Sequence, residues 1–171
     1  MSKLEIITLP DPILRKVALP VERVDDDLRR LADDMLDAMY DAPGIGLAAP
    51  QVGVSRRLIV VDVSEKEGEK KPLVLINPRI IGRADETSVY EEGCLSIPDV
   101  KVDIERPAMV DVSYLDRSGV EQTMKAEGLL ATAIQHEIDH LDGRLIIDFL
   151  SRLKRDIIIR RFKKQTRSVT A

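Results

Sequence analysis

Both histidines of the 171-residue chain lie in one five-residue stretch, His136-Glu137-Ile138-Asp139-His140. On an α-helix, residues four apart share one face about a turn from each other, so both imidazoles can reach a single metal ion. Glu137 lies between them, close enough to act on a water at that ion. The chain must therefore fold around the helix that carries this stretch, and the pattern indicates a metal-dependent hydrolase.

That helix is expected from about residue 129 to 141, with Gly143 as a left-handed cap. Both of its faces are largely apolar, so it should be buried and wrapped by sheets. An amphipathic helix is expected at 25–40, and a last one from Asp148 or Ser151 to about Gln165. Alternating apolar residues and turn sequences predict short strands at 57–63, 73–77, 87–90, 100–104, 109–115 and 120–125.

These elements predict an α+β fold, with short antiparallel sheets packed around a central metal-binding helix and further helices at the N- and C-terminal ends. With 44% hydrophobic residues, the chain can form one domain with a full core. Aromatic residues, 3% of the chain, are too scarce for nucleic-acid binding by base stacking. We expect neither a membrane span nor a signal peptide, and the single cysteine is consistent with the reducing cytosol.

Charge is unevenly distributed along the chain. Residues 151–171 contain eight Lys or Arg and one Asp, whereas residues 1–150 contain 18 Lys or Arg and 29 Asp or Glu. A basic tail on an acidic body suggests an anionic partner for the tail. A solvated terminal helix explains the same composition, and the sequence does not decide between the two.

Two histidines do not complete a catalytic metal site, which usually takes three protein ligands and keeps one position for water. Candidates for the third are an acidic residue downstream, Asp148 or Asp156, and the single cysteine, Cys94. Neither aspartate belongs to a helical pattern that points back at the histidines. Cys94 lies in an irregular loop bounded by Gly93 and Pro98, where a thiolate is well displayed, so we favour Cys94 over the alternative of an inert core cysteine.

Three blocks of sequence are similar to those of the peptide deformylase family. They are GIGLAAPQ at 44–51, EGCLS at 92–96 and QHEIDHLDG at 135–143, in family order, and the resemblance extends over nearly the whole chain. The two glycines of the first block allow a backbone to approach a ligand closely, although Gly44 could also simply cap the preceding helix. The resemblance implies an enzyme that removes the N-formyl group from the N-terminal methionine of newly synthesised polypeptides and releases formate.

The resemblance also implies a role for each site residue. Cys94, His136 and His140 would bind the metal, with water as the fourth ligand. Metal-bound hydroxide would attack the formyl carbonyl, with Glu137 as general base and then general acid. The side-chain amide of Gln51 and the backbone N–H of Leu95 would stabilise the oxyanion.

The peptide would lie extended along Ile45, Gly46 and the Cys94 loop, adding itself as a strand. By resemblance, Glu92 pairs with Arg106 to steady that loop. The substrate-binding residues implied in this way are Gly44, Ile45, Gly46, Tyr90, Glu92, Gly93, Leu129, Thr132 and Ala133.

One divalent metal per chain is expected. Two imidazoles and a thiolate suit zinc, nickel, cobalt or ferrous iron, and the resemblance favours Fe2+. An iron-bound thiolate open to water should lose activity in air through oxidation of Cys94.

The expected partners are formyl-methionyl nascent peptides and, through a helix over residues 152–167, the ribosome near its exit tunnel. We expect a monomer in the bacterial cytoplasm, with a catalytic domain at 1–150 and a basic helix of the same domain at 151–171.

Three other functions use parts of the same pattern. Two histidines at this spacing are most common in zinc endoproteases. Such an enzyme also needs a third histidine or a glutamate from a later helix as a ligand, and the sequence has neither at a suitable position. An electron-transfer copper site can use two histidines and a cysteine as ligands, but it needs no acid–base residue, so Glu137 would have no role. A non-catalytic module bound to ribosomes would not need an intact set of ligands and glutamate.

Overall fold

The computed structural model describes residues 3–65 and 67–170, with side chains to residue 166 in the second range. Three α-helices, α1, α2 and α3, span Asp26–Asp41, Gly128–Leu141 and Arg152–Thr170. Short 3-10 turns, η1 to η3, lie at Pro12–Arg15, Ala49–Val52 and Ile146–Phe149. The strands β1 to β7 are Gly46–Ala48, Leu58–Val61, Leu73–Arg83, Thr87–Cys94, Ile97–Pro107, Met109–Leu115 and Glu121–Glu127.

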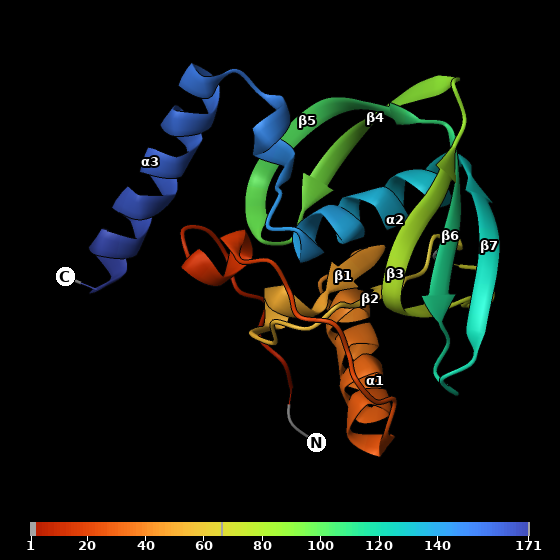
Figure 1. Ribbon diagram of the computed structural model, residues 1–171. Helices are drawn as coiled ribbons and strands as arrows, with labels where there is room; N and C mark the ends of the chain where they lie inside the picture. Colours follow the sequence, from red (N-terminus) through yellow and green to blue (C-terminus); the bar gives the residue numbers. More distant parts are fainter. Residues whose placement is uncertain (1–2, 66, 171) are drawn as a thin grey trace.

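The strands form two antiparallel sheets with α2 between them (Figure 1). One sheet has five strands in the order β1-β2-β3-β6-β7, and the other is the pair β4-β5. Helix α2 contacts strands of both sheets, and α1 packs against β1 and β2 on the far side of the larger sheet. The predicted α+β fold, with short antiparallel sheets around a central helix, is confirmed.

Helix α2 is buried along most of its length because its sequence offers apolar residues on both faces. Ala131, Ile134, Ile138 and Leu141 join a cluster with residues of the larger sheet. The helix ends as predicted, with Gly143 at a φ of +74°, and a Cβ there would come within 2.4 Å of the carbonyl oxygen of Arg15. The glycine therefore allows the N-terminal segment to pass directly under the histidine-bearing helix.

Several strands are longer than the sequence predicts. In β5, Ile97, Val100, Val102 and Ile104 point inward while charged residues between them face solvent. Beyond the predicted 100–104 segment the pattern is interrupted, by exposed Pro98 and Asp99 at one end and by Arg106, a charged residue at an inward position, at the other. Strand β3 likewise continues past Asn77 and Pro78, a pair that predicts a turn, through an irregularity in its pairing with β6. Strand β1 was not predicted at all.

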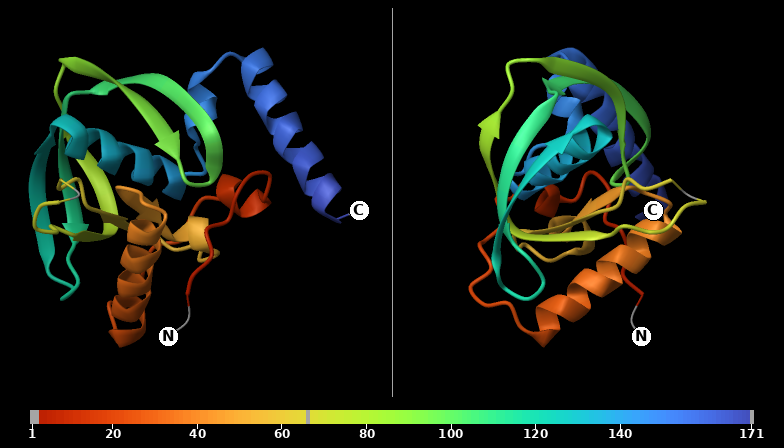
Figure 2. Two further views of the ribbon diagram at one scale, coloured as in Figure 1. Left: turned by 180° about the vertical axis from the view of Figure 1, so that it is seen from behind. Right: turned by 90° about the vertical axis from the view of Figure 1, so that its right-hand side faces the viewer.

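Helix α3 stands to one side of the body (Figures 1 and 2). Ser151 begins it, with its hydroxyl oxygen accepting a hydrogen bond from the backbone N–H of Lys154 at 3.3 Å. The alternative cap, Asp148, was wrong, because its carboxylate accepts from the N–H of Leu145 and from Arg15 instead. The helix also runs beyond the predicted end at Gln165.

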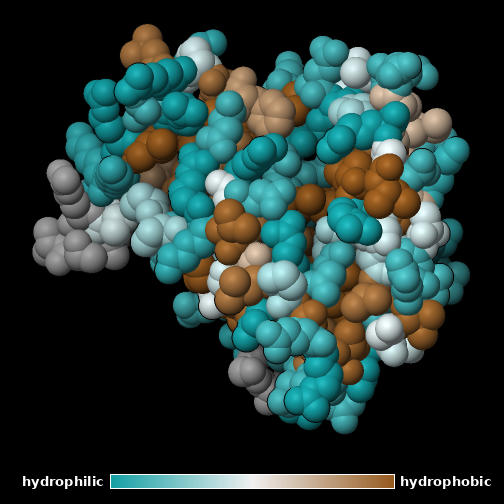
Figure 3. Space-filling view, viewed as in Figure 1, coloured by the Kyte–Doolittle hydropathy of each residue, from teal (hydrophilic) through white to brown (hydrophobic). Residues whose placement is uncertain are grey.

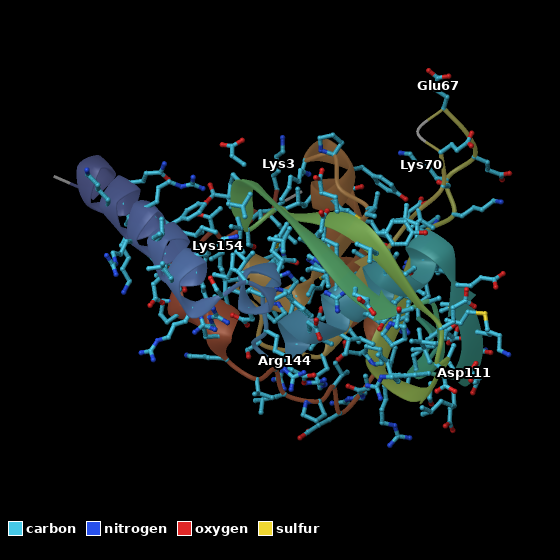
Figure 4. All side chains as sticks on the ribbon, turned by 90° about the horizontal axis from the view of Figure 1, so that it is seen from above. Lys3, Glu67, Lys70, Asp111, Arg144 and Lys154 are labelled. Atoms are coloured by element: carbon cyan, nitrogen blue, oxygen red, sulfur yellow. The ribbon has the colours of Figure 1, made fainter. Side chains whose placement is uncertain are left out.

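The inner face of α3 packs through Phe162 into a second cluster with residues of η1, β5 and η3. Seen from above in Figure 4, α3 lies at the left, and Glu67 in the β2–β3 connection projects at the upper right. No helix within residues 3–65 and 67–170 is long and apolar enough to cross a membrane.

Candidate metal centre

Cys94 was predicted in an irregular loop, but it is the last residue of β4, where it pairs with Ile97 of β5. There it converges with His136 and His140, which lie in the C-terminal half of α2. Their ligand atoms all lie within 4.8 Å of one another, and the Cys94 Sγ is 3.3 Å from His140 Nε2. The two imidazole rings are 5.0 Å apart between centroids, as one helical turn dictates. A thiolate and two imidazoles at this separation match the ligand set of a transition-metal or zinc site.

The ring of His136 is oriented by Glu92, on β4. Its Nδ1 lies 3.0 Å from Glu92 Oε1, and since a carboxylate only accepts, Nδ1 donates and Nε2 keeps its lone pair. Arg106, on β5, holds the same carboxylate through Nε at 2.7 Å and Nη2 at 3.0 Å. The predicted pairing of Glu92 with Arg106 is therefore present, and all three side chains are buried.

Charge around the ligands favours a cation. Burial lowers the pKa of His136, but the negative charges of Glu137 and Cys94 and the hydrogen bond to Glu92 raise it well above its usual value. The site thus stabilises positive charge at Nε2 of this ring, which either a proton or a bound metal ion can supply. Burial, with the charges of His136 and Arg106, instead holds the pKa of His140 well below its usual value, so that this imidazole is neutral and able to ligate. These residues fit a divalent metal.

Glu137 lies beside the ligands, with Oε2 at 3.9 Å from His136 Nε2. Burial raises the pKa of its carboxyl group to about 7. The other oxygen, Oε1, is buried without a hydrogen-bond partner among the described residues. A buried polar atom without a partner is unusual in a native structure and is typical of a group that meets a ligand or water in use.

Gln51 is held with its amide NH2 toward the cluster. Its Oε1 accepts from the N–H of Ala48 at 2.9 Å, and its Nε2 donates to Ser96 Oγ at 3.0 Å and lies 3.7 Å from Cys94 Sγ. Ser96, fully buried, is a residue that the sequence reasoning missed, although it ends the block EGCLS. Leu95 lies between Cys94 and Ser96 in the turn that joins β4 to β5.

A cavity of about 570 Å³ opens in front of the cluster. This volume lies within the range of small-molecule and peptide side-chain sites. Neither His140 nor Arg106 lines it, because both lie behind the other site residues. The lining includes the other residues that the sequence singled out: Gly44, Ile45, Gly46, Gln51, Tyr90, Glu92, Gly93, Cys94, Leu95, Leu129, Thr132, Ala133, His136 and Glu137.

The two acidic alternatives for the third ligand lie elsewhere. Asp148 forms an ion pair with Arg15 at 2.7 Å, and Asp156 lies 4.0 Å from Arg152 on α3. Within the part of the chain that the structure describes, Cys94, His136 and His140 form the one group of three or more Cys, His, Asp or Glu side chains placed to hold a metal ion.

Comparisons with known proteins agree with this geometry. A family model described as polypeptide deformylase matches residues 3–156. A protein named peptide deformylase from Rhizobium meliloti (strain 1021) is 61% identical over 163 residues, which cover 95% of this chain and 94% of that protein.

Solved structures are similar over the same length. The crystal structure of peptide deformylase from Ehrlichia chaffeensis has a TM-score of 0.91 and 41% identity, covering 99% of this chain and 100% of that one. That of a peptide deformylase from Legionella pneumophila has a TM-score of 0.88 and 45% identity, covering 99% and 98%. The similarity therefore includes both sheets and all three helices.

Proposed function

The chain belongs to the polypeptide deformylase family, and from that premise we propose that it hydrolyses the N-formyl group of formyl-methionyl nascent peptides and releases formate. The observation that carries the proposal is the convergence of Cys94, His136 and His140 at a cavity into which Glu137 also projects. Ligands, an acid–base group and a space for substrate thus occur together, as hydrolysis of an amide requires.

A divalent cation held by Cys94, His136 and His140 would supply the Lewis acidity that activates a water and polarises the formyl oxygen. Glu137 takes the proton of that water at its buried carboxylate and later delivers it to the nitrogen of the departing methionine. The amide of Gln51, fixed by Ala48 and Ser96, donates to the oxygen that becomes negatively charged. The backbone N–H of Leu95 would be the second donor.

The substrate would lie extended across the cavity mouth, between the segment 44–46 and the end of β4 at Cys94. Two of the residues at this mouth, Ile45 and Leu129, are hydrophobic side chains left 43% and 40% exposed, which suits contact with an apolar methionine. Tyr90, Thr132 and Ala133 would line the remainder of the methionine pocket. Gly44 and Gly93 would let the peptide backbone approach.

We propose Fe2+ as the bound metal, with Zn2+, Ni2+ or Co2+ as substitutes that the same ligands accept. Cys94 is partly exposed, unlike the two histidines, so its sulfur is the ligand that oxygen species in the cavity would reach first.

The basic tail is proposed as a ribosome contact, in a monomeric enzyme of the bacterial cytoplasm. Residues 1–150 would carry the chemistry, and 151–171 would extend from the same domain. Figure 3 shows hydrophilic residues over much of α3. The helix also exposes the apolar side chains of Leu153 and Ile157. A basic helix of this kind suits a polyanion such as ribosomal RNA.

Formate release tests the proposal. The iron-loaded protein is given a formyl-methionyl peptide, and formate and the free N-terminus are measured together. The same peptide with a blocked but non-formylated N-terminus is the control, because an endoprotease would cleave it internally. Internal cleavage of the control, or no formate from the formylated peptide, would contradict the proposed function.

A further inference from the structure

Asp139, the acidic residue inside the histidine stretch, has no role in the reaction as derived above. It lies on α2 between the metal-ligand candidates, but its carboxylate points away from them, toward Arg106. Asp139 Oδ2 accepts a hydrogen bond from Arg106 Nη1 at 2.8 Å, and the Asp139 side chain is 20% exposed.

Arg106 is consequently fixed on every side. Nε and Nη2 hold Glu92, Nη1 holds Asp139, and the guanidinium carbon lies 4.9 Å above the ring centroid of Phe149. Arg106 is only 6% exposed, so an N–H group that lost its acceptor there would cost free energy. Its planar set of donors can satisfy both carboxylates in one orientation only.

We infer that Asp139 is a positioning residue, which acts through Arg106 and Glu92 to hold His136 as a metal ligand. The inference rests on the proposed metal site. Without Asp139, Arg106 would be free to tilt away from its two-point contact with Glu92. The full positive charge of Arg106 would also fall on Glu92 and weaken it as an acceptor for His136 Nδ1. Both effects loosen the imidazole and make it a poorer ligand.

His140 provides a contrast on the same helix. Its Nδ1 is buried without a hydrogen-bond partner among the described residues, so no comparable chain of contacts orients it. The effect of Asp139 should therefore be confined to one of the two imidazoles. With only two histidines in the chain, nitrogen-15 NMR can observe each ring separately.

The test uses full-length zinc-loaded protein and two readouts. One is the rate at which a chelator removes zinc, and the other is the solvent exchange of each imidazole N–H proton. Asp139→Ala should release zinc about 10-fold faster, the lower end of what loss of a contact behind a ligand causes. It should also speed exchange of the His136 Nδ1 proton. Asp139→Glu, which keeps the charge, should restore much of the wild-type behaviour.

Asp142→Ala is the matched control. Asp142 caps the same helix and pairs with Arg57 at 3.0 Å, but this ion pair does not lead to a ligand. Zinc release and proton exchange should stay at wild-type values in this variant. If Asp139→Ala does not fold, the same two measurements are made on Asp139→Asn, whose side chain has the same shape as that of aspartate.

The inference is overturned if the Asp139 variant behaves like the Asp142 variant, whether both are unchanged or both release zinc equally faster. That result would leave the proposed function intact, provided that wild-type protein binds zinc through both rings and releases formate. Failure of the wild-type protein on those two points would instead overturn the proposed function.

Discussion

The Cα of Gly46, on β1, lies directly against the carboxylate of Glu137, on α2. A Cβ at position 46 would come within 2.5 Å of Glu137 Oε2 and 3.0 Å of its Cγ and Cδ. Strand β1 can therefore pass in front of the candidate metal centre only because residue 46 has no side chain. This contact links the block GIGLAAPQ to the histidine stretch, 90 residues further along the chain.

Gly46→Ala should displace Glu137 and lower kcat by about 100-fold, because a general acid–base group contributes 10²- to 10⁴-fold. Metal content should stay at the wild-type level, since the atoms nearest to the added Cβ all belong to Glu137. Steady-state kinetics with metal analysis of the same sample checks this. Gly82→Ala is the matched control, because its Cβ would approach a carboxylate of Asp111 at 2.8 Å, away from the site. Equal loss of activity in the two variants would contradict the account.

Ser96→Ala should lower kcat by about 2- to 10-fold, the equivalent of one ordinary hydrogen bond. The hydroxyl of Ser96 fixes the Gln51 amide, so its loss leaves the oxyanion donor present but less well placed. Gln51→Ala, which removes the donor itself, should reduce kcat on the order of 100-fold or more. Peptide KM should change little in either variant. A Ser96→Ala loss as large as that of Gln51→Ala would mean that Ser96 has another role.

Asp62 should contribute stability that disappears at acid pH. Its buried carboxylate accepts hydrogen bonds from the hydroxyls of Ser64 and Tyr40 and from the backbone N–H groups of Ser64 and Lys71. Burial acts to raise the pKa of Asp62, but these bonds lower it overall. The folded-state pKa thus lies below the unfolded value of about 3.9. The contribution is complete above the unfolded value and is lost as pH falls below it through the folded value.

Denaturant unfolding of Asp62→Asn between neutral and acid pH measures this contribution. The variant should lose about 1–3 kcal/mol at neutral pH and show a shallower decline than wild type in acid. Asp37→Asn, at an exposed position on α1, should match wild type at each pH. Parallel pH profiles for wild type and Asp62→Asn would rule the prediction out.

Iron-loaded protein should lose activity in air, whereas zinc-loaded protein should keep it, because an iron-bound thiolate is exposed to oxidation chemistry that zinc does not promote. Mass spectrometry of the inactivated sample should find added oxygen on the peptide that contains Cys94. Anaerobic incubation of the same sample is the control. Inactivation with an unmodified Cys94, or full activity after prolonged exposure to oxygen, would refute it.

The sequence predicted the fold class, the boundaries of α1 and α2 and the group of ligand candidates, because these depend on local periodicity and on rare residue types. The four-residue spacing of His136 and His140 already implies that both lie on one face of a helix. Cys94 could be chosen because the chain has no other thiol. The amphipathic pattern of α1 was similarly readable from neighbouring residues.

What the sequence did not predict depends on pairing between distant segments. Strand β1 exists because Gly46–Ala48 pairs with β2, and three residues carry too little pattern to show it. The hydrogen bond of Ser96 to Gln51 and the approach of Asp139 to Arg106 depend on the register of β4 with β5 and on how α2 lies against them. No local signal specifies such contacts.

The central claim is that Cys94, His136 and His140 bind one metal ion while Glu137 performs proton transfer. Metal content and formate release, measured on the same samples of wild type, Glu137→Ala and His136→Ala, test it most directly. Glu137→Ala should keep one metal per chain and lose about 100-fold or more in kcat, whereas His136→Ala should lose the metal as well. A metal-free Glu137→Ala, or a His136→Ala variant with full metal and activity, would contradict the account.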